Sequence, residues 1–333
     1  MSVLVTGVAG FLASHVADSL LAAGQEVVGL DDLSGGFREN VAAGVRFYEG
    51  SILDTDLLRR IFSENRIQHV FHLAAYAAEG LSHFIRVFNY TNNVVGSVNV
   101  LNEAVRNGVE CLVFTSSIAV YGSAEPPFGE DTVPIPEDPY GIAKRAVELD
   151  LEAARRMFGI NYVIFRPHNI YGERQNTGDR YRNVIGIFMN QLLKGEAMTV
   201  FGDGGQTRGF TYVGDVAPLI ARSIGMPQTW NRVFNIGADA SVTVNELARL
   251  VAEAMDRPCL LSHLEPRHEV RHAVASHAKL AAAFGYRPQW ELRDGLRRMA
   301  DWAKAAGPRE QPVFERLELE QSLPRIWKTA EGI

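Results

Sequence analysis

Two side chains with complementary chemistry stand four residues apart in the segment Tyr140-Gly141-Ile142-Ala143-Lys144. Positions i and i+4 share one face of a helix, so the Lys144 ammonium is expected near the Tyr140 phenol. A free tyrosine has a pKa of about 10 and is a poor base at neutral pH, and a nearby positive charge favours its phenolate. The spacing predicts an acid/base pair, although it also occurs by chance in many helices.

A hydroxyl is expected to meet this pair from the segment Thr115-Ser116-Ser117, which follows the apolar run 111–116. Such a run is typical of a strand buried on both faces. Ser117 would then lie at the carboxyl end of a parallel strand, the edge where ligands bind in sheets of this kind.

Glycines follow the first apolar run, in the segment Thr6-Gly7-Val8-Ala9-Gly10-Phe11-Leu12-Ala13. They permit a tight strand-to-helix turn and let a pyrophosphate approach the N-terminus of a helix. We therefore expect Gly7, Gly10, Phe11 and Leu12 to hold the phosphates of a dinucleotide. An ordinary turn is the alternative for this pattern taken alone.

Asp31 ends the second apolar run, about 21 residues after Gly10. A carboxylate there accepts hydrogen bonds from the adenosine ribose and repels a 2′-phosphate, so NAD is favoured over NADP. Asp32 could share this role, although a turn residue is the simpler interpretation. Further cofactor contacts are expected from Ser51, Ile52, Leu73, Ala74 and Ala75, for which tight packing of small residues is an equally good explanation.

Apolar runs alternate with helical patterns through the first half of the chain. The expected strands are residues 3–7, 26–31, 45–50, 69–74, 111–116 and 162–166, and the expected helices are 11–23, 54–63, 84–107 and 140–158. This alternation predicts an α/β fold with a doubly wound, Rossmann-type parallel sheet. We expect residues 1–166 to bind NAD, with segments at about 210–240 returning to that domain. Residues 167–333 would form a smaller, mixed α/β region for the substrate.

Composition argues against several functional classes. The chain has 333 residues and a formal net charge of −6, which disfavours binding to a nucleic-acid backbone. Its two cysteines, Cys111 and Cys259, form no zinc-ligand pattern, so no metal is expected. The sequence contains no apolar stretch of roughly 18 residues and no secretory leader. These features predict a cytoplasmic protein without a membrane partner.

Several ordered motifs resemble the extended short-chain dehydrogenase/reductases, specifically the nucleotide-sugar epimerase and dehydratase group. They are TGVAGFLASH, HLAA, TSSIAVYG, YGIAK, RPHNIYG and FGDGGQTRGFTYVGDV, and only the last 25 or so residues fall outside the resemblance. The resemblance implies that Ser117 is the catalytic hydroxyl and Tyr140 the acid/base. Lys144 would tune Tyr140 and hold the nicotinamide ribose, and Ser116 would lie at the cofactor.

The same resemblance implies where the substrate binds. It places Asn169 at the sugar diphosphate and pairs Arg208 and Arg267 with the phosphates, a role that suits the guanidinium fork. Surface ion pairs are the alternative for both arginines. Asn93 is expected near the cofactor or the sugar, and Ala273 at the gate of the sugar pocket. His168 and Ser276 depart from the family pattern, in which Phe or Ala and Asp are usual.

The implied reaction is inversion at C4 of a nucleotide-sugar through a transient 4-keto intermediate. Related dehydratases carry an Asp-Glu pair after the catalytic hydroxyl, and decarboxylases a Glu. This chain has Ile118 and Ala119 there, which cannot move a proton. Epimerisation is therefore expected. The alternatives are another nucleotide-sugar enzyme, an NADPH-dependent carbonyl reductase, disfavoured by Asp31, and a non-catalytic dinucleotide sensor.

The hexose is expected to be neutral. Relatives that act on uronates tend to carry Thr and Arg where this chain has Asn169 and Asn176, so UDP-glucose and UDP-galactose are favoured. A small Ala273 would also leave room for UDP-GlcNAc, whereas Arg180 and Arg182 keep UDP-glucuronate open.

The predicted helices 84–107 and 140–158 carry apolar residues on more than one face. Relatives pair these helices in a four-helix interface, so a homodimer is expected.

Overall fold

The core of the protein is one parallel sheet of seven strands. The computed structural model describes residues 2–181, 183–266, 272–310, 314, 317–324 and 327, although not the side chains of residues 272 and 273. The strand order is β11-β6-β5-β4-β1-β2-β3. The strands are β1 (Ser2–Thr6), β2 (Glu26–Asp31), β3 (Arg46–Glu49), β4 (Ile67–His72), β5 (Cys111–Thr115), β6 (Asn161–Pro167) and β11 (Arg232–Ile236). This arrangement confirms the predicted doubly wound fold.

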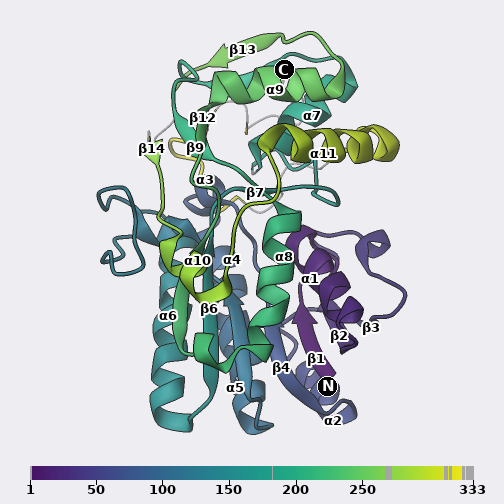
Figure 1. Cartoon of the computed structure of the whole chain (residues 1–333), viewed down its shortest axis with the longest axis vertical. Coiled ribbons are helices and arrows are strands. Elements are labelled where there is room, and N and C mark those ends of the chain that lie inside the picture. Colours follow the sequence, from purple (N-terminus) through teal and green to yellow (C-terminus); the bar gives the residue numbers. More distant parts are fainter. Residues whose placement is uncertain are drawn as a thin grey trace.

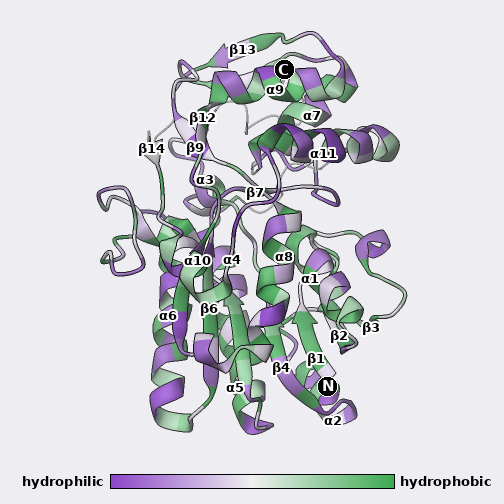
Figure 2. Cartoon of the chain, viewed as in Figure 1, coloured by the Kyte–Doolittle hydropathy of each residue, from purple (hydrophilic) through white to green (hydrophobic). Residues whose placement is uncertain are grey.

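Helices cover both faces of the sheet (Figure 1). Side chains alternate along each strand, so Val3 and Val5 of β1 pack into one core and Leu4 into the other. The first core includes side chains of α1 (Phe11–Ala22), α8 (Val213–Arg222) and α10 (Ala278–Phe284). The second includes side chains of α2 (Thr55–Glu64), α5 (Gly96–Arg106) and α6 (Pro139–Phe158). Figure 2 shows the apolar strands enclosed between these helices.

The helix predicted over residues 84–107 is divided in the structure. It consists of α4 (Arg86–Tyr90), a π-helical turn (Thr91–Val95) and α5, and a short helix α3 (Glu79–Ser82) precedes it. Helix α5 packs closely on the segment after β3, because a Cβ at Gly96 would lie 2.4 Å from the Ile52 side chain. Turns with π geometry often occur at functional sites, and this one packs against α6.

The second half of the chain builds a smaller region above the carboxyl ends of the parallel strands (Figure 1). Its helices are α7 (Val184–Lys194), α9 (Val244–Met255) and α11 (Leu292–Ala306). Its short strands are β7 (Ile170–Tyr171), β8 (Met198–Phe201), β9 (Thr207–Gly209), β10 (Thr211–Tyr212), β12 (Ser241–Thr243), β13 (Leu261–Leu264) and β14 (His272–Ala273). No helix among the described residues is long and apolar enough to cross a membrane.

Candidate active site

A single continuous cavity of about 1420 Å³ lies between the sheet and the smaller region. Pockets for one small ligand commonly measure about 300–1,000 Å³, so this cavity can hold a cofactor and a substrate together. Most of the residues predicted from sequence line it: Gly7, Gly10, Phe11, Leu12, Asp31, Asp32, Ser51, Ile52, Leu73, Ala74, Ala75, Ser117, Tyr140, Asn169 and Arg208.

The turn between β1 and α1 forms a cradle for phosphates. Gly7 has a φ of +75°, and a Cβ there would lie 2.8 Å from the Ala74 backbone. Gly10 precedes α1 without a side-chain cap, and the first turn of α1 carries no acidic residue. The N–H groups and the positive end of the helix dipole therefore suit an anion. This geometry fits the pyrophosphate of a dinucleotide.

Asp31 at the end of β2 is built into this cradle. Its carboxylate accepts hydrogen bonds from the N–H groups of Ala9 at 3.0 Å and Leu33 at 2.8 Å. Burial raises the pKa of this carboxyl, while the two N–H donors act in the opposite direction. Asp32 also lines the cavity but is exposed, and it accepts from the N–H of Ser34 at 3.0 Å as a turn residue does.

Helix α6 begins so that Tyr140 is presented to the cavity. Pro139 occupies its first turn, and the Asp138 side chain caps it by accepting from the N–H of Gly141 at 2.9 Å. The N–H of Tyr140 donates to Ser82 Oγ of α3 at 3.3 Å. Burial raises the pKa of the Asp138 carboxyl.

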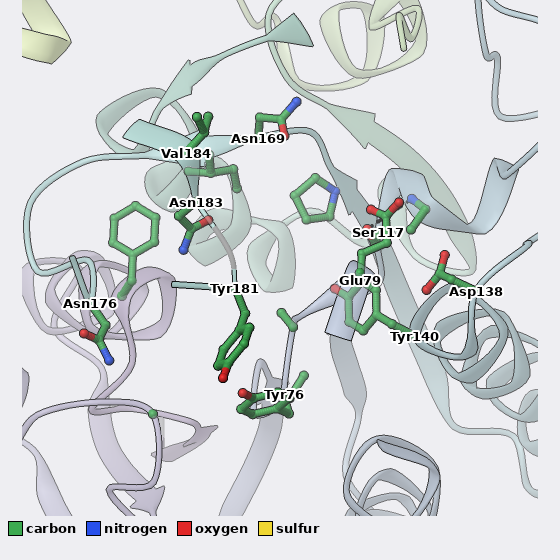
Figure 3. A pocket seen from close by; sticks show the side chains of 18 of the residues that line it. Tyr76, Glu79, Ser117, Asp138, Tyr140, Asn169, Asn176, Tyr181, Asn183 and Val184 are labelled. Carbon is green, nitrogen blue, oxygen red and sulfur yellow. Dashed lines mark hydrogen bonds between the residues drawn. The ribbon is translucent and has the colours of Figure 1, made fainter. Parts of the chain in front are cut away.

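Ser117 and Tyr140 meet because α6 packs tightly against the turn that follows β5. A Cβ at Gly141 would lie only 2.6 Å from the carbonyl oxygen of Ala119, so only glycine permits this contact. Ser117 Oγ accepts from the N–H of Ala119 at 3.1 Å. Figure 3 shows both hydroxyl side chains on one side of the cavity.

Lys144 lies beneath Tyr140 and does not line the cavity. It is 3 % exposed, and its Nζ donates to the carbonyl oxygen of Thr115 at 2.8 Å. The same Nζ is 5.8 Å from the centre of the Tyr140 ring, as the i,i+4 spacing predicts. Burial lowers the pKa of Lys144 to about 7. The Nζ also lies 4.7 Å from the centre of the Phe114 ring, and contact of Lys144 with a nicotinamide ribose stays a prediction.

Two residues predicted to contact the cofactor, Asn93 and Ser116, do not line the cavity. Asn93 is 2 % exposed, and its side chain bonds the N–H and carbonyl of Tyr76 at 2.8 and 3.0 Å. Asn93 therefore positions that backbone, and its neighbour Asn92 lines the cavity instead. Ser116 is 2 % exposed and lies away from the cavity, because side chains alternate along an extended segment between Thr115 and Ser117.

The substrate end of the cavity is formed by the second half of the chain. Asn169 has a φ of +39°, and its amide donates to the carbonyl of Gly209 at 3.1 Å. Arg208 on β9 lines the cavity, and its backbone pairs with that of Ala273 on β14. The side chain of Ala273 and the whole of Arg267 lie outside the described residues.

Sequence motifs did not indicate several further lining residues. Glu79 on α3 lies near Ser117 and Tyr140, while Tyr181 and Asn183 lie across the cavity (Figure 3). The end of the cavity between β8 and β13 is lined by Thr199, Val200, Phe201, Leu264, Glu265 and Pro266. Only the apolar run at 198–201 could have suggested these residues. Among the described residues, no group of three or more His, Cys, Asp or Glu side chains could hold a metal.

Comparisons with known proteins agree with this geometry. The model of the NAD dependent epimerase/dehydratase family matches residues 3–237. A UDP-glucose 4-epimerase of Mycolicibacterium smegmatis is 34 % identical over 310 residues, covering 91 % of this chain and 98 % of the relative. The structure of Thermotoga maritima UDP-glucose 4-epimerase with UDP-glucose is 35 % identical, with a TM-score of 0.88 and coverage of 92 % and 99 %. That of the Thermus thermophilus UDP-glucose 4-epimerase complex with NAD is also 35 % identical, with a TM-score of 0.84 and coverage of 91 % and 98 %.

Proposed function

Because the chain belongs to the NAD dependent epimerase/dehydratase family, we propose that it catalyses NAD-dependent epimerisation at C4 of a nucleotide-sugar, interconverting UDP-glucose and UDP-galactose. One observation carries this proposal. Ser117 and Tyr140 line the same continuous cavity as the phosphate cradle at Gly7 and Gly10 and as the substrate end at Asn169 and Arg208. Similar proteins that carry the name UDP-glucose 4-epimerase support this choice of substrate.

The chain's own residues handle the proton of the reacting hydroxyl. Tyr140 takes the proton from the C4 hydroxyl when the sugar is oxidised and returns it when the sugar is reduced. Ser117 holds the same oxygen by a hydrogen bond, and the buried Lys144 beneath the ring favours the phenolate when it is charged. When bound, NAD would supply a reversible hydride acceptor for C4, so no cofactor would be consumed over a full cycle.

The cavity matches the parts of a UDP-hexose. Arg208 lies where it can pair with the diphosphate. The end between β8 and β13 carries the Phe201 ring, which suits a flat base. Asn169 and Asn176 line the cavity and carry no charge, which supports a neutral hexose.

A panel of nucleotide-sugars tests this function directly. Purified protein is incubated with UDP-glucose, UDP-GlcNAc and UDP-glucuronate, and kcat/KM is determined from the separated products. We expect UDP-glucose to yield UDP-galactose without net formation of NADH. A preference for UDP-glucuronate of more than about tenfold, roughly 1.4 kcal/mol of transition-state stabilisation, would contradict the role given to the two amides.

Glu79 favours one second candidate, removal of water from the sugar. Ile118 and Ala119 follow Ser117 and cannot move a proton, but the α3 carboxylate of Glu79 lines the cavity near Tyr140 (Figure 3). A carboxylate in such a place could serve an elimination. The same panel decides between the two functions, because elimination yields a 4-keto-6-deoxy sugar and epimerisation does not.

The protein is also proposed to form a homodimer through α4, α5 and α6. The Phe84 and Phe88 rings at the start of the predicted helix 84–107 pack against Trp327 and Phe314 of the same chain. Val87, Leu149 and Met157 remain 69 %, 48 % and 77 % exposed. An apolar surface of this kind favours association.

Sedimentation at micromolar concentration tests the dimer. We expect a dimer for the wild type and a monomer for Leu149→Glu, because a charge would be buried in the interface. Leu260→Glu is the matched control, since Leu260 is 59 % exposed and lies outside these helices. A stable wild-type monomer would refute the dimer and leave the proposed chemistry intact.

A further inference from the structure

Beyond α11 the structure describes residues 307–310, 314, 317–324 and 327, which we call the C-terminal tail. Several of these residues bind other parts of the chain through their backbone. Arg309 pairs through its N–H and carbonyl with the Asn190 side chain at 2.9 and 3.0 Å. The N–H of Phe314 donates to the Tyr181 hydroxyl at 3.2 Å, and that of Glu318 to the carbonyl of Phe84 at 2.8 Å.

Glu318 fixes the tail to α4. Its carboxylate accepts from the N–H groups of Val87 at 2.7 Å and Phe88 at 2.9 Å, in the first turn of that helix. N–H groups at a helix start have no partner within the helix, so this contact stabilises both α4 and the path of the tail. The attachment is specific, because one carboxylate satisfies two neighbouring donors.

Two residues that follow Glu318 in the tail line the cavity. Leu323 and Trp327 are 5 % and 3 % exposed, and both line the cavity. The Trp327 ring packs edge-on against Tyr181 and Phe84, with ring centres 5.3 and 6.3 Å apart. Trp327 therefore forms a rigid aromatic part of the cavity wall together with Tyr181 and Phe84.

Helix α3 links this wall to the catalytic residues. A Cβ at Gly80 would lie 3.2 Å from the far edge of the Trp327 ring. Two residues later, Ser82 Oγ accepts from the N–H of Tyr140 at 3.3 Å. Trp327 therefore contacts the same short helix, α3, that bonds the backbone of the acid/base.

We propose that Trp327 and Leu323 form a wall of the sugar site and determine which hexose substituents are accepted. The proposal rests on the proposed epimerase function. The family model matches residues 3–237, and the family motifs leave the last 25 or so residues outside. The wall is therefore built largely from chain that the family pattern does not contain. A bulky side chain in this place is expected to exclude larger substituents such as an N-acetyl group.

The test compares kcat/KM for UDP-GlcNAc and UDP-glucose in full-length variants. Trp327→Ala enlarges the site, and we expect it to raise the ratio of the two constants by about fivefold or more, a size typical of a change in pocket volume. Glu318→Ala removes no atom from the cavity but releases the anchor, so it is expected to raise the ratio in the same direction. Leu319→Ala is the matched control, because Leu319 is in the tail, 51 % exposed and outside the cavity lining.

A second measurement does not depend on turnover. Titration with UDP-glucose is expected to change the tryptophan fluorescence of the wild type, and Trp327→Phe is expected to remove most of that change. If the ratio of kcat/KM for UDP-GlcNAc to that for UDP-glucose were unchanged in both Trp327→Ala and Glu318→Ala, the proposed role of the wall in substrate selection would be refuted. If Trp327→Ala does not fold, Glu318→Ala and the fluorescence titration decide alone. If the wild type binds UDP-glucose without turning it over, the proposed function fails, whereas the fluorescence result still tests the wall.

Discussion

Gly141→Ala is expected to disable catalysis by a backbone displacement that removes no reactive group. The new Cβ would lie 2.6 Å from the carbonyl oxygen of Ala119, and ordinary contacts begin at 3.4 Å. The start of α6 must therefore move by about 0.8 Å from the turn that carries Ser117. Displacements of about 1 Å between reacting groups cost on the order of 100-fold in rate. We expect kcat/KM for UDP-glucose to fall by about 10- to 100-fold, which is about 1.4 to 2.7 kcal/mol.

The free energy of unfolding of this variant should fall much less than its activity. Alanine is favoured over glycine in a helix by up to about 1 kcal/mol, which offsets part of the contact strain. The assay is steady-state epimerisation together with thermal unfolding of the same samples. Gly225→Ala is the matched control, because a Cβ there meets nothing within 4 Å. Wild-type kcat/KM in Gly141→Ala would show that the contact between Gly141 and Ala119 does not set the distance between Ser117 and Tyr140.

Three further outcomes follow from the site. Tyr140→Phe should abolish turnover and keep UDP-glucose binding, measured by product analysis and calorimetry; substantial remaining activity would refute the acid/base role. Asp31→Ala should weaken the binding of NAD and reduce the ratio of the affinities for NAD and NADP, both measured by cofactor titration. A wild-type preference for NADP would contradict this. The pKa of Lys144 is lowered from 10.5 to about 7, so the unfolded chain binds more protons between these values and stability from this group rises with pH. Lys144→Met should therefore raise the Tm of the cofactor-free protein at pH 7 and flatten that rise; an unchanged Tm profile would argue against a buried, destabilised ammonium.

Much of the sheet could be predicted, because strands buried on both faces must be apolar along their whole length. The runs at 26–31 and 111–116 correspond closely to β2 and β5. The helix predicted over 84–107 shows the limit of such patterns. Its periodicity does not reveal the π turn at Thr91–Val95, where Asn93 bonds the backbone of Tyr76. The residue type alone does not distinguish an asparagine that binds a ligand from one that bonds the backbone. Only the packed structure distinguishes them.

The sequence by itself determined the parts of the site whose geometry is local. Tyr140 and Lys144 share a helix face because a helix repeats every 3.6 residues, and the turn at Gly7 follows from one strand meeting one helix. The tertiary structure decided everything that depends on contacts between distant segments. It joined Ser117 to Tyr140 through the close approach of Gly141 to Ala119, and it brought Trp327 to Gly80 from the other end of the chain. Such contacts depend on how the whole chain packs, and no local period encodes them.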